Sequence, residues 1–419
     1  MTNDTFPAPT TPTVRPASAT VDGADPTAVR DGDYWYVYTT GHGILARRTR
    51  DFVTWEMLPT VFEDSVPAWA KAAIPQATNI WAPDINKVGD RYVMVYHCSF
   101  WGSQKSVMGV VSAKSLDPQH ADYGWTDHGL LIDSDPARGD DFNAIDGSIA
   151  IDQDAKPWLV WGSYWTGVKL TRMSDDGLSV PEVKDRHSVA HHAHGPEGPQ
   201  ITYRDGWYYL IASYAGGPNY QVRVGRSREI SGPYLDRQGK DMLDGGGTPM
   251  TKASPGVVGP GHHGLALGDD RFGDLLLCHV FNRYSRDLYV ADLDWDHDGW
   301  PVVGEAYTPA GPAIADLAQH LIRHRFICIQ DGAHIGSSGY RWLTFSSDGR
   351  VEAVTASNVK TGGTWTLDGR QLTMIWPAGG ATSDLQTDTI MVAKDGSHFA
   401  GRSDKDIDVR GALASRFEW

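Results

Sequence analysis

The sequence predicts an all-β fold, in which a five-bladed β-propeller is followed by a small antiparallel β-barrel or sandwich domain. Three observations lead to this prediction. A turn followed by a run of aromatic and β-branched residues recurs five times before residue 322. Polar residues precede these runs at intervals of 51 to 65 residues, the size of a blade with several strands. After residue 322 the pattern changes to short alternating segments between Asp-Gly and Gly-Gly turns.

We divide the chain into an N-terminal extension (1–20), a propeller (21–322) and a C-terminal β domain (323–419). Each copy of the repeated pattern begins with turn-forming residues and continues as an apolar strand. The copies are DGDYWYVYTTG from Asp31, GDRYVMVYHCS from Gly89, AKPWLVWGSYW from Ala155, DGWYYLIASY from Asp205 and GDLLLCHVFN from Gly273.

The last part of the chain follows a segment with helical character, AIADLAQHLIRHRF. Its segments GYRWLTFSSDGRVEAV, GTWTLDGRQLTMIW, DTIMVAKDGSHFAG and GALASRFEW alternate apolar and polar residues, as expected of an antiparallel meander with one face in a core. Trp342, Trp365, Trp376 and Trp419 can contribute to that core. We therefore expect this domain to lie beside the propeller and outside its channel.

Composition and charge exclude several functional classes. The 419 residues include 37 Lys and Arg against 52 Asp and Glu, a formal charge of −15. This balance argues against binding nucleic acid, which requires a concentrated basic surface, and no apolar stretch is long enough to span a bilayer. Cys98, Cys278 and Cys328 do not form a disulfide framework or a zinc motif. The 16 Trp and 17 Tyr favour sugar binding.

Five polar residues precede the five repeats: Asp25, Asp84, Asp146, Glu197 and His262. The first strand of each propeller blade lines the central channel, so these side chains should converge at one mouth of it. A single such residue would more often make only a turn hydrogen bond. Five at corresponding positions indicate a functional site.

Three carboxylates at this mouth suggest hydrolysis of a glycosidic bond, which needs a protonated acid and an ionised base or nucleophile. Glu197 is the candidate general acid, because neighbouring carboxylates would raise its pKa. Asp25 is the candidate base that deprotonates water. Asp146 would keep the pKa of the acid high and orient it, while Asp84 is expected to organise a turn.

Further residues are candidates for binding substrate or an ion. Trp81, Trp101 and Trp165 could stack on a sugar ring, although each could also be part of the blade core. We also assign Asn143 and Ser163 to substrate binding. His262, in GPGHHG, could bind a metal ion or water on the channel axis as a neutral imidazole, although a single histidine is more often structural.

An acidic segment later in the chain resembles a calcium-binding loop. Asp294, Asp296, Asp298, Gly299 and Glu305 match the acidic and glycine positions of an EF-hand. Such a loop needs flanking helices, whereas LYVADLDW and WPVV have the pattern of strands. A hairpin turn is therefore the better interpretation.

The chain resembles glycoside hydrolase family 43, and within it the endo-1,5-α-L-arabinanases. The resemblance covers most of residues 20–305 and rests on ADPTAVRDGDYWYVYTTG, IWAPDI, AIDGSIAIDQDAKPWLVWGSYWTGVKL, EGPQITYRDGWYYLIASY, GPGHHG and above all VGRSREISGPYLDRQGKDMLDGGGT. It implies an inverting enzyme with Asp25 as base, Glu197 as acid and Asp146 as the modulating carboxylate. It also implies a calcium ion near His262, held mainly through waters, and arabinan or arabino-oligosaccharides as substrates.

Other functions and two locations stay open at this point. The alternatives are an exo-acting arabinofuranosidase or xylosidase of the same family, a retaining five-bladed fructan hydrolase, and a sugar-binding propeller without activity. The first residues lack a basic segment followed by an apolar one. We therefore expect a cytoplasmic enzyme, or a secreted one whose signal has been removed, and the sequence leaves the oligomeric state undetermined.

Overall fold

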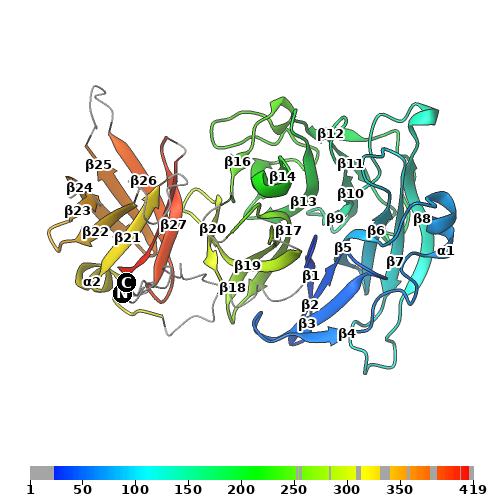
Figure 1. The fold of residues 1–419 in the computed structure, drawn as a ribbon, viewed down its shortest axis with the longest axis horizontal. Helices are drawn as coiled ribbons and strands as arrows, with labels where there is room; N and C mark the ends of the chain where they lie inside the picture. The colour runs from blue at the N-terminus through cyan, green and yellow to red at the C-terminus, as the bar shows by residue number, and fades with distance from the viewer. Residues whose placement is uncertain are drawn as a thin grey trace, which may run out of the picture.

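The computed structural model describes residues 23–251, 253, 257–282, 285–307, 313–330, 340–355, 359–377, 385–405 and 407–414. Its strands form five four-stranded antiparallel sheets and one closed eight-stranded barrel (Figure 1). The predicted fold class is therefore confirmed. The predicted N-terminal extension and Trp419 lie outside the described residues.

Each blade is formed by four consecutive strands. Blade 1 contains β1 (Thr27–Asp31), β2 (Tyr34–Thr39), β3 (Leu45–Thr49) and β4 (Glu56–Leu58). Blade 2 contains β5 (Trp81–Val88), β6 (Arg91–Cys98), β7 (Ser106–Ala113) and β8 (Thr126–Ser134). Blade 3 contains β9 (Ser148–Ile151), β10 (Pro157–Trp161), β11 (Val168–Arg172) and β12 (His187–Ala190).

Blades 4 and 5 continue the same order. Blade 4 contains β13 (Pro196–Arg204), β14 (Trp207–Tyr214), β15 (Gln221–Ser227) and β16 (Thr248–Pro249). Blade 5 contains β17 (Gly261–Asp269), β18 (Gly273–Phe281), β19 (Arg286–Trp295) and β20 (Pro301–Ala306). The short helices in and after the propeller are α1 (Ala68–Ala73), η1 (Pro136–Arg138), η2 (Gly217–Asn219), η3 (Met242–Asp244) and α2 (Leu317–Arg323). No helix in the described ranges has the roughly 20 residues that a membrane span requires.

The five repeated runs of the sequence form the second strands of the blades, β2, β6, β10, β14 and β18. These strands are almost entirely buried. They lie inside their sheets with neighbouring blades against both faces, which explains why their apolar residues are continuous rather than alternating. The first strands, β1, β5, β9, β13 and β17, follow one another around the axis, and β17 returns to β1.

The ring closes between blades 5 and 1 without exchanging a strand among the described residues. The Gly23 N–H donates to the Arg286 carbonyl (2.9 Å), and Trp35 Nε1 donates to Asp269 Oδ2 (2.9 Å). An apolar cluster shared by the two blades fills the seam, with core residues Trp35, Val37, Phe52, Ala266, Leu275, Leu277, Leu288, Val290 and Tyr307. Hydrogen bonds and side-chain packing therefore close the ring.

The barrel is closed by pairing of its first and last strands. It contains β21 (Arg325–Gln330), β22 (Tyr340–Phe345), β23 (Arg350–Thr355), β24 (Lys360–Asp368), β25 (Gln371–Trp376), β26 (Gln386–Val392), β27 (His398–Ser403) and β28 (Asp408–Leu413). Phe326, Trp365 and Phe399 belong to its apolar core. Leu317 and Leu321 join that core, so α2 packs with the barrel although most of it lies before the predicted boundary at residue 322.

The barrel lies against blade 5, with β27 next to β20 (Figure 1). Arg370 forms an ion pair with Asp294, and His398 Nε2 lies 3.5 Å from Asp292 Oδ2. Asp294 belongs to the segment that resembled a calcium-binding loop. Strands β19 and β20 flank that segment, so the hairpin interpretation is confirmed.

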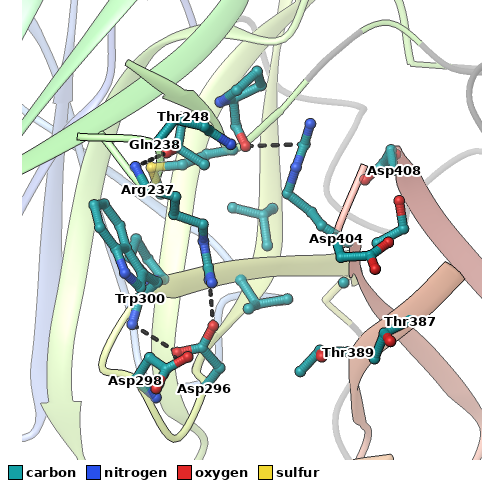
Figure 2. Close-up of a pocket in the computed structure, with 18 of the residues that line it drawn as sticks. Arg237, Gln238, Thr248, Asp296, Asp298, Trp300, Thr387, Thr389, Asp404 and Asp408 are labelled. Atoms are coloured by element: carbon teal, nitrogen blue, oxygen red, sulfur yellow. Dashed lines mark hydrogen bonds and ion pairs between the residues drawn. The ribbon is translucent and has the colours of Figure 1, made fainter. Parts of the chain in front are cut away.

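A cavity of about 500 Å³ lies between the propeller and the barrel. Figure 2 shows Arg237 reaching Asp296 on the propeller side, with Asp404 and Asp408 on the barrel side. The three candidate catalytic carboxylates do not line this cavity. The candidate site is therefore distinct from the space between the domains.

Candidate active site

The five blades share one unusual backbone position at the start of their first strands. Asp25, Ala82, Asp146, Gly198 and His262 occupy it with φ angles of 54°, 30°, 55°, 54° and 45°. Residues other than glycine adopt this left-handed region at a cost of about 1–3 kcal/mol, and such residues concentrate at functional sites. The repeated conformation, strained at the four non-glycine residues, indicates that the backbone direction is required at this position of every blade.

Strand irregularities make the sequence correspondence inexact. The register shifts between Trp81 and Asp84, between Glu197 and Gln200, and between Gly261 and Gly264. Asp25, Asp146 and His262 are structurally equivalent, but Glu197 lies one residue before the equivalent position of its blade and Asp84 lies two residues after. The prediction that all five polar residues are equivalent is therefore wrong for these two, because β-bulges redirect side chains within the strands.

The backbone N–H groups at the shared position bind the preceding blade. Ala82 N donates to Thr40 Oγ1 (2.7 Å), Asp146 N to His97 Nδ1 (3.2 Å), and Asp25 N to His279 Nδ1 (3.2 Å). The same group of His262 donates to Ser213 Oγ (2.9 Å). In blade 4 the acceptor differs, because Gly198 N donates to the carboxylate of Asp146, at Oδ2 (3.1 Å). Asp146 therefore holds the backbone directly beside Glu197.

Asp84 connects four blades at the axis. Its Oδ2 accepts hydrogen bonds from Thr27 Oγ1 (3.1 Å) and Gln200 Nε2 (2.7 Å), and its Oδ1 accepts from Ile149 N (3.1 Å). Burial raises the pKa of Asp84 to about 6 against the opposing effect of these hydrogen bonds. The residue predicted to organise a turn therefore joins blade 2 to blades 1, 3 and 4.

Asp25 is held by cationic and neutral donors. Arg286 NH1 lies 3.2 Å from its Oδ1, and Thr40 Oγ1 donates to Oδ2 (2.5 Å). Burial favours the neutral carboxyl, but His262, Arg286 and His279 outweigh that effect and hold the pKa of Asp25 well below its usual value. Burial also lowers the pKa of His262 to about 4. Arg286 is therefore a cation beside Asp25 that does not depend on protonation of His262.

Glu197 has a hydroxyl group on each of its oxygens. Ser163 Oγ donates to Oε2 (2.9 Å), and Tyr220 Oη donates to Oε1 (2.6 Å). Burial raises the pKa of Glu197, with a further contribution from the charge of Asp25, and the two hydrogen bonds oppose this rise. Ser163, predicted to bind substrate, therefore contacts the predicted acid.

Asp146 is the third buried carboxylate. Its Oδ1 lies 3.5 Å from His97 Nε2. Burial, Glu197 and Asp25 together raise the pKa of Asp146 well above its usual value, while the Gly198 N–H opposes the rise. Burial lowers the pKa of His97 to about 3, so its imidazole is neutral and does not offset the charge of Asp146.

His262 lies beside a small axial cavity. The cavity has room for about one water-sized sphere (≈ 10 Å³), and Asp84, Asp146, His262 and His263 are among its lining residues. The His262 Nδ1 atom lies 3.5 Å from Asp25 Oδ1. Both ring nitrogens of His263 are buried without a hydrogen-bond partner in the described part of the chain, so the cavity offers a polar environment for water or a hydrated ion.

The predicted binding residues differ in exposure. Trp101 is 93% exposed and Trp165 is 43% exposed, as expected of side chains that can stack on a ligand. Trp81 packs edge-on against His97, with ring centroids 6.0 Å apart. Asn143 is buried, and its Oδ1 accepts a hydrogen bond from Ser106 Oγ (2.7 Å). Asn143 therefore supports the local loop structure, and its assignment to substrate binding stays a prediction.

Sequence reasoning missed the residues that support the carboxylates. His97 and His279 lie near the ends of buried second strands, Tyr220 follows η2, and Arg286 begins β19. None of these four residues lies in a sequence motif that would have identified it. The ends of the five repeated runs, aligned with one another, could have drawn attention to Thr40, His97, Ser213 and His279, because these positions are polar in otherwise apolar segments.

Comparison with known proteins gives consistent results. A family model described as glycosyl hydrolases family 43 matches residues 17–301. An extracellular exo-α-(1→5)-L-arabinofuranosidase of Cellvibrio japonicus is 36% identical over 306 residues, which cover 68% of this chain and 87% of that protein. An extracellular endo-α-(1→5)-L-arabinanase of Bacillus subtilis is 33% identical, covering 68% of this chain and 91% of that protein.

Solved structures resemble the chain over one or both domains. The Cellvibrio cellulosa α-L-arabinanase complexed with arabinohexaose has a TM-score of 0.64 and 34% identity, covering 68% of this chain and 95% of that one. An endo-1,5-α-L-arabinanase from Thermotoga petrophila has a TM-score of 0.76, 20% identity, and covers 94% of this chain and 98% of that one. At that identity the second match shows the fold alone, and it extends over the barrel.

Proposed function

Because this chain belongs to glycosyl hydrolases family 43, we propose that its three buried carboxylates cleave α-1,5-linked L-arabinofuranosyl bonds with inversion of configuration. The chain is a glycoside hydrolase, and its substrates are arabinan or arabino-oligosaccharides. Relatives named for both exo and endo action on this linkage support the substrate class, as does the related structure with arabinohexaose.

The observation that carries the proposed mechanism is the opposite direction of the pKa shifts within one site. Asp25 is held ionised, whereas the pKa values of Glu197 and Asp146 are raised. Hydrolysis of a glycoside needs one carboxylate that accepts a proton and one carboxyl that donates a proton. Two groups whose surroundings shift their pKa values apart can divide these roles.

In this mechanism Asp25 removes a proton from water as the water attacks the anomeric carbon. Glu197 gives its proton to the departing glycosidic oxygen, which leaves with the electron pair of the broken bond. Asp146 contacts neither the water nor the leaving group in this proposal. It acts on Glu197 through the electrostatic coupling of the two buried carboxyl groups and through its hydrogen bond from Gly198 N.

The axial cation stays a proposal. Within the described ranges, His, Cys, Asp and Glu side chains form no group of three able to share an ion. A hydrated cation with His262 as one ligand fits, because that imidazole is neutral and borders the small polar cavity. Such an ion would supply positive charge beside the carboxylates. Elemental analysis and activity after chelator treatment test this proposal.

We also propose secretion. The predicted cytoplasmic location finds no support among the relatives, whereas the alternative, a secreted enzyme, agrees with two relatives that are named extracellular. Expression of the full-length gene in its own host, followed by activity assays of the medium and of the cells, tests this proposal. Activity confined to the cells would contradict it.

The proposed function is tested by the stereochemistry and the size of the first products. NMR of linear arabinan during the first turnovers should show the inverted anomer, whereas a retaining fructan hydrolase would cleave fructan and release the retained anomer. A mixture of oligosaccharides indicates endo action, and a single short product indicates exo action. Absence of any hydrolysis of arabinan or arabino-oligosaccharides would overturn the proposal and favour a sugar-binding protein.

A further inference from the structure

We propose that Tyr220 is a positioning residue that keeps the transferable proton of Glu197 on one carboxyl oxygen, Oε2. The inference rests on the proposed function, in which Glu197 is the general acid. Tyr220 does not need to touch substrate for this role. It acts through the hydrogen bond from its hydroxyl to Glu197 Oε1, which is 2.6 Å long.

The two hydroxyl groups on Glu197 are chemically unequal. The pKa of Tyr220 is raised well above its usual value, first by burial and then by the charges of Glu197 and Asp146. Its hydroxyl therefore stays protonated, and a phenol donates hydrogen bonds better and accepts them less well than an aliphatic alcohol, so Oε1 is held as the acceptor in the shorter contact (2.6 Å). Ser163 Oγ, 2.9 Å from Oε2, can rotate its hydroxyl and either donate or accept. The proton of the acid is therefore placed on Oε2.

The surroundings of Tyr220 leave its ring little freedom. Its side chain is 4% exposed. A Cβ atom at Gly261 would lie 1.9 Å from Tyr220 Cδ1, so glycine at that position gives the ring its space. On another side, the His279 ring lies at a centroid distance of 5.6 Å and an angle of 31°. These contacts hold the hydroxyl in place before substrate binds, which is the requirement for a positioning residue.

Several charged or titratable groups act on Glu197 besides Tyr220. Burial and the charge of Asp25 raise its pKa, while the Ser163 hydroxyl and His279 lower it. Asp146 and Tyr164 also interact electrostatically with Glu197. Tyr220 is the largest of the influences that lower the pKa of Glu197. Removal of its hydroxyl should therefore raise the pKa of the acid further.

The effect on proton transfer follows from the charge that develops on Glu197. When the Oε2–H bond breaks, the proton passes to the glycosidic oxygen and its electron pair stays on the carboxylate. The hydrogen bond from Tyr220 to Oε1 becomes stronger as that charge forms, because hydrogen bonds to ionised groups are the stronger kind. Tyr220 therefore stabilises the transition state more than the ground state.

Tyr220→Phe tests this inference, with Tyr214→Phe as the matched control. Tyr214 is a buried tyrosine of the same blade, and its hydroxyl has no hydrogen-bond partner among the described residues. With arabino-oligosaccharides, Tyr220→Phe should lower kcat about 10-fold with little change in KM. Its kcat/KM profile should extend about one to two pH units further at the basic limb, as expected when one hydrogen bond to a carboxylate is lost. Tyr214→Phe should match the wild type.

A substrate with an activated leaving group distinguishes a role of Tyr220 in protonating the leaving group from a role in packing alone. Because it needs little protonation, Tyr220→Phe should cleave it at a rate close to that of the wild type. An unmoved basic limb in Tyr220→Phe, together with an inactive Glu197→Gln, would overturn the role of Tyr220 while leaving Glu197 as the acid. Full activity of Glu197→Gln on arabino-oligosaccharides would instead overturn the proposed function. A lower Tm with unchanged kcat would show that Tyr220 serves packing alone, and would likewise overturn the inference.

Discussion

The centre of the propeller is lined by carboxylates and imidazoles, whereas the centre of the barrel is filled by aromatic and aliphatic side chains. The backbone differs in the same way. Among the described residues, every non-glycine residue with positive φ lies in the propeller, and three of them are Asp25, Asp146 and His262. Both domains close a ring of strands, but one places strain and buried charge at its axis. The comparison shows that the buried groups of the proposed chemistry lie in the propeller, whereas the barrel is built around an apolar core.

The largest expected effect comes from replacing the three carboxylates of the propeller. Asp25→Asn, Asp146→Asn and Glu197→Gln should each lower turnover of 1,5-arabinan by about 10³-fold or more, because each removes part of one acid and base unit. Circular dichroism and Tm should show that the folds are intact. With an activated leaving group, Glu197→Gln should recover more activity than Asp25→Asn. Near-normal turnover of arabinan by Glu197→Gln would contradict the assignment of the acid.

A core substitution in the barrel tests whether this domain affects stability without affecting catalysis. Phe399→Ala should lower the free energy of unfolding by about 3–5 kcal/mol, because a fully buried ring is removed and a cavity remains. Below its Tm the variant should hydrolyse arabinan at the rate of the wild type. Phe399→Leu serves as the milder control. A loss of intrinsic turnover in a fully folded Phe399→Ala would show that the two domains are not separate in function.

Asp84 refines the comparison, because it is a buried carboxyl group at the propeller axis whose hydrogen bonds join four blades. Its folded pKa of about 6 lies above the unfolded value of 3.8, so the folded state holds the proton more tightly. Asp84 therefore adds to the free energy of unfolding below pH 4. This contribution, about 3 kcal/mol in total, is lost as the pH rises to 6. Denaturant titrations at several pH values should show that Asp84→Asn removes this component. An unchanged difference between pH 4 and pH 6 would contradict it.

Removal of residues 313–419 should have the smallest effect on chemistry. The barrel covers part of blade 5 and forms the Arg370–Asp294 ion pair with it, so the propeller alone should have a lower Tm or solubility. Its turnover per folded molecule should stay within about threefold, because the barrel lies away from the three carboxylates. A stable but inactive propeller would show that the barrel supplies substrate contacts.

Much of the fold was predictable, because repeated buried strands leave a period in the sequence. The second strands indicated the number of blades directly, and the alternating segments after residue 322 indicated a barrel or sandwich, which is a closed barrel in the structure. The burial of three carboxylates close enough to influence one another was also predictable, since Pro and Gly accompany them in the repeats. The supporting residues were not, because His279 and Arg286 reach Asp25 from the other end of the propeller sequence. One-residue shifts at bulges, such as that at Glu197, leave no sequence signal either.

The seam between blades 5 and 1 has a consequence for the order in which the enzyme is made. Asp25 is among the first described residues of the chain, but its partners His279 and Arg286 lie more than 250 residues later. A ribosome therefore completes most of the propeller before the base can acquire its environment. Domains generally fold as units during synthesis, so we expect the unfinished chain to be inactive until blade 5 has emerged and joined blade 1. Activity therefore indicates that the ring of five blades has closed.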